Sequence, residues 1–380
     1  MSENRLKDLH DAGVAIWLDF IDRTILKNGD LARRIRDDAV TGMTSNPTIF
    51  EKALAEGSTY DDQIRFSAGD FTVMELFERI ATTDVRDACD IFRPTHDALH
   101  GADGFVSIEV SPGAAHDATA TIDEATRLWK TVDRPNAFVK VPGTVEGAKA
   151  VRQLTAAGVN INITLLFAIE AYARVIDAYM AGLEERVAAG KDISNIHSVA
   201  SFFVSRVDTE TDKRLDAAAK GNPADAKTLE ALKGKAAIAN AKLAYRLYQE
   251  QIASPRWMAL SAKGATVQRP LLASTSTKNP AYRDVMYVEE LIGPNTVNTM
   301  PPQTVDAFRD HGNVERTVDK DVDEAQATID ELAKYGISID DVTAKLLVDG
   351  IASFQKSYDS LIAGLQTKTK ALGKELVESH

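Results

Sequence analysis

The chain has 380 residues, of which 44% are hydrophobic and 26% are charged, and this composition excludes an extended disordered protein. The 44 Lys and Arg against 56 Asp and Glu give a formal net charge of -12, so we expect no binding to nucleic acid or to an anionic membrane, and an anionic ligand needs a local basic pocket. A single cysteine, no signal-peptide core and no apolar run of roughly 18 residues predict a reduced, cytoplasmic protein.

Eight short apolar runs rich in β-forming residues recur along the chain and alternate with helix-like stretches. In chain order the runs cover residues 14–19, 39–45, 105–110, 137–141, 159–165, 197–204, 270–274 and 295–299. The clearest helical stretch, between the fifth and sixth runs, places Ile169, Ile176 and Leu183 on one apolar face. Eight such units predict an α/β fold of the (β/α)8 TIM-barrel type. An open doubly wound sheet is the main alternative, but the number of strands and the absence of a G-x-G-x-x-G turn after the first run disfavour it.

Two segments exceed a minimal barrel. Residues 208–262, between the predicted sixth and seventh strands, are rich in helix-forming sequence, and residues 314–380 carry long amphipathic patterns. The sequence contains no Pro- or Ser-rich linker, no low-complexity tract and no repeat of fixed length. We therefore expect one barrel domain over residues 1–380, with additional helices that cap or flank it.

Polar side chains stand late in the predicted strands, where a buried wall is normally apolar. In a barrel of this type the active site collects at the carboxyl ends of the strands, so these residues are candidates for chemistry. They are Asp19, Asn46, Glu109, Lys140, Asn162, Thr164, Ser201 and Ser274.

Lys140 lies in the apolar string FVKVPGT, in the predicted fourth strand. Apolar surroundings disfavour the charged ammonium and so favour the neutral amine, which attacks carbonyl carbons. The product of that attack is a Schiff base, whose protonated nitrogen accepts electrons when a neighbouring carbon–carbon bond breaks. The alternative is a lysine at a strand end that extends its ammonium into solvent.

Asp19 and Glu109 are acidic residues inside apolar runs. Schiff-base chemistry needs several proton transfers, and two carboxylates in different surroundings suit it. Two carboxylates also suit a glycoside hydrolase, in which Lys140 would be structural. For either acid alone, a salt bridge to a neighbouring cation is a third interpretation.

Three further residues suit the recognition of a polyol. Asn46 precedes Pro47, which holds it extended, and its amide offers both a donor and an acceptor. Asn162 and Thr164 alternate with isoleucines and so share one face of the predicted fifth strand. A plain Asn-Pro turn and a threonine chosen for β propensity are the alternatives.

Two cations follow the later strands, where barrels often bind phosphate through hydroxyl groups, backbone amides and a positive charge. Arg206 follows the predicted sixth strand and Lys278 follows the seventh. Hydroxyl groups of Ser201, Ser274 and Ser276 lie beside them in the sequence. The alternative is that both cations lie on the surface.

Six strings occur in an order that resembles the transaldolases, the Schiff-base sugar-phosphate enzymes of the pentose phosphate pathway. The strings are WLDFIDR, GMTSNPTIF, SIEVSP, FVKVPGT, NINITLLF and SFFVSRVD, and the resemblance extends to about Thr299. It implies a (β/α)8 barrel of the class I aldolase type. It also implies transfer of a dihydroxyacetone unit from sedoheptulose 7-phosphate to glyceraldehyde 3-phosphate, giving erythrose 4-phosphate and fructose 6-phosphate, without a metal or an organic cofactor.

The resemblance assigns roles to the polar residues. Lys140 matches the Schiff-base lysine, Glu109 the acid and base that works through a bound water, and Thr164 the hydroxyl that holds this water. Asp19 matches the carboxylate that serves the substrate hydroxyl whose proton leaves during cleavage.

The remaining matches concern substrate binding. Asn46 and Asn162 match side chains that bind the dihydroxyacetone unit. The pocket and phosphate positions are matched by Ser201, Phe203, Arg206 and Ser274. Many relatives carry an arginine two residues after Ser274, where this chain has Ser276, and we expect Lys278 to supply the missing charge.

The sequence leaves three alternatives to a transferase. The related fructose 6-phosphate aldolases are shorter and carry a neutral residue at the position of Glu109, so the carboxylate favours transfer over release of dihydroxyacetone. A sugar-phosphate binder without turnover would keep the cations and serines. Metal-dependent chemistry is disfavoured because the seven histidines show no ligand spacing, and His197, the one near a predicted strand, is interpreted as structural.

Overall fold

The strands close into a parallel barrel in which each strand pairs with its neighbours in the chain and β8 pairs with β1. The computed structural model describes residues 4–377. The strands are β1 Val14–Asp19, β2 Val40–Thr44, β3 Phe105–Glu109, β4 Ala137–Pro142, β5 Ile161–Leu166, β6 Ser198–Phe203, β7 Gln268–Ala273 and β8 Thr296–Met300. The predicted (β/α)8 barrel is confirmed, and an open sheet is excluded because every strand is paired on both sides.

Each predicted strand overlaps an observed one and differs from it only in its first or last residues. Strand β7 shows why they differ. This strand begins at Gln268, earlier than predicted, because two polar residues at its start find partners inside the protein. Gln268 Nε2 donates a hydrogen bond of 3.0 Å to Ser198 Oγ, and Arg269 forms an ion pair of 3.4 Å with Asp103. These partners lie 70 and 166 residues away in the sequence, so no local pattern indicates them.

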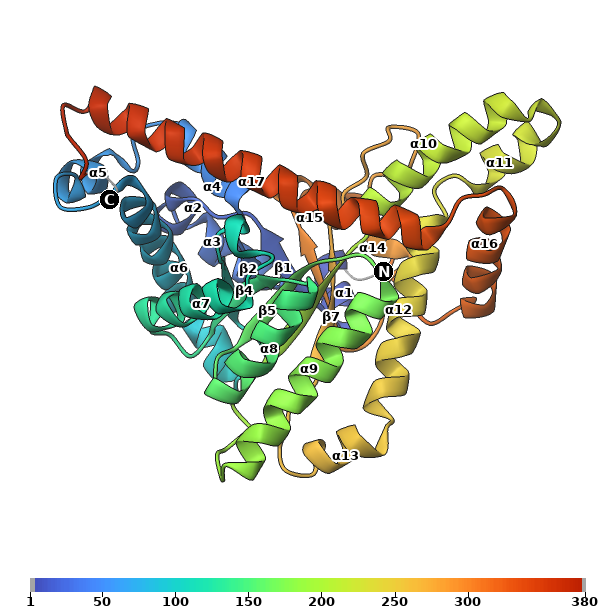
Figure 1. Cartoon of the computed structure of the whole chain (residues 1–380), viewed down its shortest axis with the longest axis horizontal. Coiled ribbons are helices and arrows are strands. Elements are labelled where there is room, and N and C mark those ends of the chain that lie inside the picture. Colours follow the sequence, from blue (N-terminus) through green and yellow to red (C-terminus); the bar gives the residue numbers. More distant parts are fainter. Residues whose placement is uncertain (1–3, 378–380) are drawn as a thin grey trace.

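Helices return the chain from the carboxyl end of each strand to the amino end of the next (Figure 1). Local sequence explains their ends: α6 starts with a capping box between Thr72 and Glu75, and α8 ends at Gly158, which takes a positive φ of 95°. No helix within residues 4–377 is long and apolar enough to cross a membrane. The helices up to β6 are α1 Arg5–Asp11, α2 Arg23–Lys27, α3 Asp30–Asp37, α4 Pro47–Ala55, α5 Asp61–Ser67, α6 Val73–Ala98, η1 Pro112–Ala114, α7 Ala118–Val132, α8 Val145–Ala157 and α9 Ile169–Ala188.

The two segments that exceed a minimal barrel are largely helical. The helices after β6, inside and outside these segments, are α10 Ser205–Gly221, η2 Pro223–Asp225, α11 Ala226–Leu232, α12 Ala236–Ile252, α13 Pro255–Ser261, α14 Met286–Glu289, α15 Pro302–His311, α16 Val322–Lys334 and α17 Ile339–Ala371. Helix α17 runs across the barrel, from α16 at one end to α5 at the other, and packs against α4, α6, α10 and β5 (Figure 1). The last three residues of the predicted extension lie outside the described residues, and the assignment of one domain stays a prediction.

Three aromatic side chains pack against one another inside the barrel, below the polar residues. The ring centroids of Trp17, Phe105 and Phe138 lie between 4.4 and 6.4 Å apart. Gly42 leaves room for them, since a Cβ atom at this position would lie 2.5 Å from the Trp17 ring. The His197 ring lies 5.0 Å from Phe105, and burial lowers the pKa of His197 to about 4. A neutral packing role, as expected from the sequence, agrees with this position.

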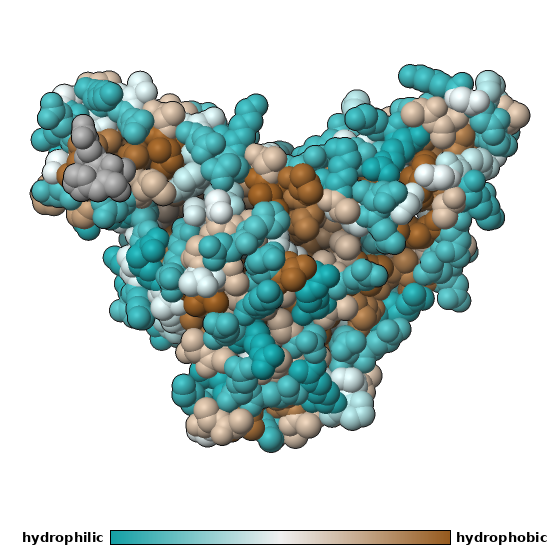
Figure 2. Space-filling view, in the orientation of Figure 1, coloured by the Kyte–Doolittle hydropathy of each residue, from teal (hydrophilic) through white to brown (hydrophobic). Residues whose placement is uncertain are grey.

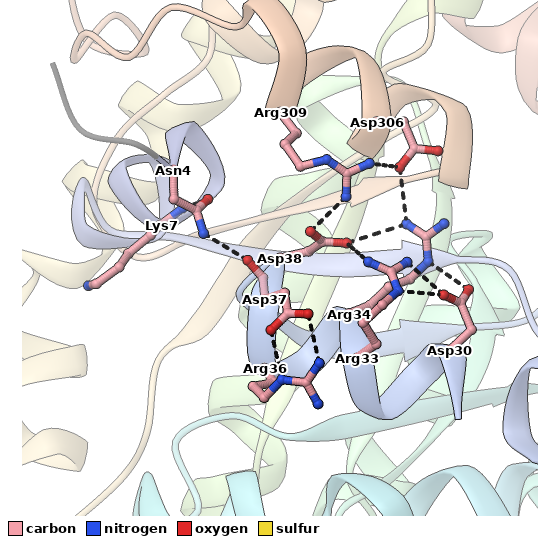
Figure 3. A network of polar contacts seen from close by, with 10 residues as sticks. All are labelled: Asn4, Lys7, Asp30, Arg33, Arg34, Arg36, Asp37, Asp38, Asp306 and Arg309. Atoms are coloured by element: carbon pink, nitrogen blue, oxygen red, sulfur yellow. Dashed lines mark hydrogen bonds and ion pairs between the residues drawn. The ribbon is translucent and has the colours of Figure 1, made fainter. Parts of the chain in front are cut away.

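A network of charged residues joins α1, α3 and α15 at the amino ends of the strands (Figure 3). Its centre is Asp38, which lies two residues before β2 and whose side chain is 2% exposed. The Asp38 carboxylate accepts a hydrogen bond of 2.7 Å from Arg309 Nη1 and lies 3.4 Å from Arg33 and 3.7 Å from Arg34. Residues at the amino ends of the strands of such a barrel are expected to stabilise the fold, whereas the chemistry takes place at the carboxyl ends.

We therefore expect Asp38→Asn to destabilise the fold without changing catalysis. Removing one partner of a buried ion pair leaves the other charge uncompensated, and because Arg33 and Arg309 remain partly exposed the loss should be about 2 kcal/mol. Urea unfolding followed by circular dichroism measures it. Asp37→Asn is the matched control, since Asp37 is exposed and pairs with the exposed Arg36. Equal unfolding midpoints for the two variants would contradict the role given to Asp38.

The face shown in Figure 2 is mostly hydrophilic, and its apolar patches are small and scattered. This distribution agrees with a composition in which 26% of the residues are charged, as is ordinary for a globular domain. Only a concave basic site inside such a surface can attract an anion, because the average field of the molecule repels it.

Candidate active site

Lys140 lies inside the barrel near the carboxyl end of β4 and is 5% exposed. Its Nζ atom lies 3.2 Å from Glu109 Oε2 and donates a hydrogen bond of 3.2 Å to the backbone carbonyl of Ser45. The neighbouring Val139 and Val141 are fully buried on the other face of the strand. The interpretation of Lys140 as a strand-end lysine that extends into solvent is therefore wrong.

The two acids differ in their surroundings although burial raises the pKa of both. Strand register sets Glu109 beside Lys140, and the lysine partly offsets the effect of burial on the pKa of Glu109. Burial raises the pKa of Asp19, whereas the positive charges of Lys140, Lys278 and Arg206 lower it. Carboxylic acids whose pKa values are raised can both donate and accept protons near neutral pH.

Two buried oxygen atoms on β3 and β5, the strands on either side of β4, have no hydrogen-bond partner among residues 4–377. They are Glu109 Oε2, whose contact with Lys140 is an ion pair without hydrogen-bond geometry, and Thr164 Oγ1. Buried polar atoms normally form hydrogen bonds, because leaving one unpaired costs about 1–3 kcal/mol. These two oxygen atoms are suitable partners for a water molecule or a substrate hydroxyl.

Asn162 occupies the β5 position that pairs with Lys140, and two serines orient its side chain. Asn162 Nδ2 donates a hydrogen bond of 3.0 Å to Ser107 Oγ, and Asn162 Oδ1 accepts one of 2.7 Å from Ser201 Oγ. The sequence prediction missed Ser107, although the alternation in VSIE sets it on the same strand face as Glu109. This hydrogen-bonded chain links β3, β5 and β6 inside the barrel.

Asn46 lies two residues after the end of β2 and caps the N-terminus of α4. Its side-chain oxygen accepts a hydrogen bond of 3.0 Å from the Ile49 amide, and Pro47 occupies the first helical position. The side-chain amide nitrogen of Asn46 has no partner among the described residues, so it can donate to a ligand. The cap therefore fixes the direction of a free hydrogen-bond donor.

Two cations lie together at the other side of the site. Arg206 is in the first turn of α10, directly after β6, and Lys278 is in the loop that follows β7, with Nζ 2.8 Å from Ser276 Oγ. Burial lowers the pKa of each cation, and the positive charge of Arg206 lowers that of Lys278 further. An anion bound between them relieves this repulsion.

The backbone at the same edge contains two strained residues. Ser274 directly follows β7, and Leu165 is the last residue but one of β5. Both take left-handed conformations, with φ of 57° and 58°. Such conformations cost roughly 1–3 kcal/mol for a residue other than glycine, and they cluster at functional sites. Ser274 Oγ lies 3.0 Å from Ser205 Oγ, which links the end of β7 to the start of α10.

A cavity of about 470 Å³ brings most of the predicted residues together. Glu109, Asn162 and Thr164 do not line it: Glu109 contacts Lys140, and the two β5 residues are fully buried. The predicted residues that line it are Asp19, Asn46, Lys140, Ser201, Phe203, Arg206, Ser274 and Lys278. Residues that the sequence prediction missed include Thr44, Lys52, Thr299, Gln303 and Phe354.

The missed residues differ in how far the sequence could have indicated them. Thr44 and Thr299 stand late in predicted strands, so the argument used for Thr164 applies to them too. Phe354 comes from α17, more than two hundred residues after Lys140, and only the packing of that helix brings it here. Within residues 4–377 no group of three or more His, Cys, Asp and Glu side chains is arranged to hold a metal ion.

A second cavity of about 510 Å³ lies on the other side of Glu109, between α4, α6, α7 and α17. Its lining is mainly apolar and includes Phe77, Met74 and Tyr358, whereas Lys140 and the two cations do not line it. We therefore assign the chemistry to the first cavity.

Comparison with known proteins agrees with this geometry. A sequence model of the family described as Transaldolase/Fructose-6-phosphate aldolase matches residues 16–365. The chain is 50% identical to a transaldolase of Parafrankia sp. over 359 residues, which cover 94% of this chain and 96% of that protein. It is 50% identical to a transaldolase of Acidothermus cellulolyticus over 97% of this chain and 98% of the relative, and 47% identical to one of Trichodesmium erythraeum over 98% and 99%. The chain belongs to the transaldolase/fructose-6-phosphate aldolase family.

Proposed function

We propose that the chain is a transaldolase that transfers a dihydroxyacetone unit from sedoheptulose 7-phosphate to glyceraldehyde 3-phosphate, giving erythrose 4-phosphate and fructose 6-phosphate. The observation that carries the proposal is Lys140, a buried amine at the carboxyl end of β4 with a carboxylate 3.2 Å away and a cavity in front of it. The family and its relatives named transaldolase support the same reaction.

The first step is the formation of the Schiff base. Glu109 takes a proton from the Lys140 ammonium, and the neutral amine attacks the ketone carbon of the donor sugar. The raised pKa of Glu109 then allows it to return the proton, through a water held with Thr164, to the hydroxyl that leaves as water. The products of this step are an iminium ion on Lys140 and one molecule of water.

The second step cleaves the carbon–carbon bond. Asp19 removes the proton from the hydroxyl on the far carbon of the bond that breaks, counted from the iminium carbon, and this far carbon becomes the aldehyde carbonyl. The electron pair of the broken bond moves to the iminium nitrogen, which leaves a three-carbon enamine on Lys140. Reversal with glyceraldehyde 3-phosphate forms a new bond, Asp19 returns its proton to the new alkoxide, and water then hydrolyses the Schiff base.

The other polar residues of the cavity hold the substrate. The amide of Asn46 and the oriented chain of Asn162 and Ser201 suit the hydroxyl groups of the dihydroxyacetone unit. Phe203 lies at the wall of the cavity, and Arg206, Lys278 and Ser274 suit the phosphate group. We further propose that the enzyme works in the reduced cytoplasm, in line with Cys89, its single and buried cysteine.

Trapping the Schiff base tests the function. Wild-type protein is incubated with fructose 6-phosphate, treated with sodium borohydride and digested, and its peptides are weighed by mass spectrometry. We expect a reduced three-carbon adduct on the peptide that contains Lys140. No adduct at saturating substrate would contradict the covalent mechanism and favour a hydrolase or a binder without turnover. Rapid release of free dihydroxyacetone without an acceptor would instead assign the chain to the aldolases of the same family.

Lys278 provides a sharper prediction about the phosphate group, because Ser276 stands where many relatives carry arginine. Lys278→Ala should raise the KM for glyceraldehyde 3-phosphate about tenfold, because one charge-assisted hydrogen bond contributes about this factor to binding. The KM for glyceraldehyde, which has no phosphate group, should stay unchanged. Lys278→Arg should restore most of the affinity, and Lys263→Ala, an exposed lysine before β7, is the control. An unchanged KM in Lys278→Ala would contradict the role of this lysine.

A further inference from the structure

Helix α17 contributes an aromatic side chain to the cavity. Phe354 is 5% exposed and lines the cavity together with Arg206. Its ring centroid lies 5.8 Å from Arg206 Cζ, and the ring of Phe203 lies 5.1 Å from the same atom. Two aromatic rings, from β6 and from the C-terminal segment, therefore face one guanidinium group within cation–π distance.

The guanidinium group of Arg206 has no other direct support. Among the described residues it donates no hydrogen bond and forms no ion pair, and Asp19 and Glu109 act on it only through longer-range attraction. All of its donors are therefore available to a ligand. A long side chain of this kind loses rotamer entropy when a ligand orders it, unless packing orders it first. The two rings supply that packing.

A close contact between α17 and β5 sets the position of Phe354. Gly350 lies one helical turn before Phe354, so both residues are on the same face of α17. A Cβ atom at Gly350 would lie 2.9 Å from Leu165 Cδ2 and 3.6 Å from Arg206 Nη1. Leu165 is 3% exposed, has a left-handed backbone and lies where the β5–β6 register is irregular, so it has little freedom to move away.

We propose that Phe354 is a positioning residue for phosphate recognition, which holds the Arg206 guanidinium group against Phe203 and toward the cavity. The inference rests on the proposed function in one respect, namely that Arg206 binds the phosphate group of the substrate. It extends that function because it makes the C-terminal helix, which contains none of the reacting groups, a determinant of substrate affinity. Gly350 supports Phe354 by letting α17 approach the end of β5.

The test separates the aromatic ring from its bulk. Phe354→Leu keeps an apolar side chain but removes the ring, and Phe354→Tyr keeps the ring. For Phe354→Leu we expect inorganic phosphate to bind roughly 3- to 10-fold more weakly by isothermal titration calorimetry, the range of a partly desolvated cation–π contact. The KM for glyceraldehyde 3-phosphate should rise by a similar factor, whereas kcat and the KM for glyceraldehyde stay within about twofold. Phe354→Tyr should remain close to the wild type.

Two controls make the result specific. Tyr358→Leu removes a ring from the same helix one turn later, where it packs against Phe77 in the second cavity, and should leave phosphate affinity unchanged. In an Arg206→Lys background, Phe354→Leu should have little further effect, because the ring acts through the guanidinium group. Gly350→Ala should weaken phosphate binding in the same direction as Phe354→Leu.

Wild-type phosphate affinity in Phe354→Leu would overturn the proposal, as would equal rises in KM for the phosphorylated and the unphosphorylated acceptor. Phosphate binding needs no turnover, so it reports on Phe354 even if the Schiff base cannot be trapped. Failure of the trapping experiment would overturn the proposed reaction, whereas failure of the phosphate titration would overturn only the role of Phe354.

Discussion

Replacing Lys140 by methionine should reduce the transfer of dihydroxyacetone by roughly 10,000-fold or more, the loss expected when a covalent nucleophile is removed. Methionine matches the length of the lysine stem and suits a position that is 5% exposed, so the fold should remain intact. The reason for the loss is chemical: without the amine there is no iminium ion to accept the electrons of the breaking bond. A coupled assay with fructose 6-phosphate and erythrose 4-phosphate measures the rate.

Lys149→Met is the matched control for this prediction. Lys149 is an exposed lysine on α8, and its replacement should leave the rate unchanged. Circular dichroism and the unfolding midpoint show whether both variants are folded. A Lys140→Met variant that retains a tenth of wild-type activity would remove the Schiff base from the mechanism.

Asp19→Asn should separate the formation of the Schiff base from the cleavage that follows it. The amide cannot accept the substrate hydroxyl proton, so kcat should fall by roughly 100- to 10,000-fold, the usual contribution of a general base. Lys140 and Glu109 remain in place, so the donor sugar should still bind covalently. Borohydride should then trap an adduct of the intact hexulose phosphate on Lys140, where wild-type protein gives the three-carbon adduct.

Asp22→Asn is the control for Asp19→Asn, because Asp22 lies outside the cavity and caps α2. Asparagine is also a good N-cap residue, so this variant should keep both stability and rate. A three-carbon adduct in Asp19→Asn, formed at the wild-type rate, would assign the proton transfer to another group. Glu109 is the nearest alternative, since burial also raises its pKa.

The cavity also explains how a protein with a net charge of -12 can bind a sugar phosphate. Arg206, Lys278 and Lys52 all line the cavity and come from three different elements. Their positive charges act in a partly buried site, where screening by water and salt is weaker than on the surface. The local field near these cations therefore has the opposite sign to the average field of the molecule.

Much of the barrel could be predicted because its strands are local patterns. Alternation with period two sets Asp19, Glu109 and Lys140 on the inner face of their strands, and each stands near a carboxyl end. The start of β7 could not be predicted, because polar residues such as Gln268 and Arg269 are typical of a loop. Only their distant partners explain why they lie in a strand. The resemblance in short strings added the roles of these residues, which the pattern alone left open between a Schiff-base enzyme and a hydrolase.

The sequence by itself determined the eight strands, the polar edge of the barrel and the candidate nucleophile, since each depends on residues close together in the chain. Only the tertiary structure decided that Lys140 lies against Glu109 and the Ser45 carbonyl, that Asn162 is held between two serines, and that Phe354 lies over Arg206. These contacts join residues from different strands and helices, so they depend on barrel register and on the packing of α17 across β5. Local propensity carries no information about such pairs, because their contacts form, and stabilise the protein, only when the whole barrel has closed.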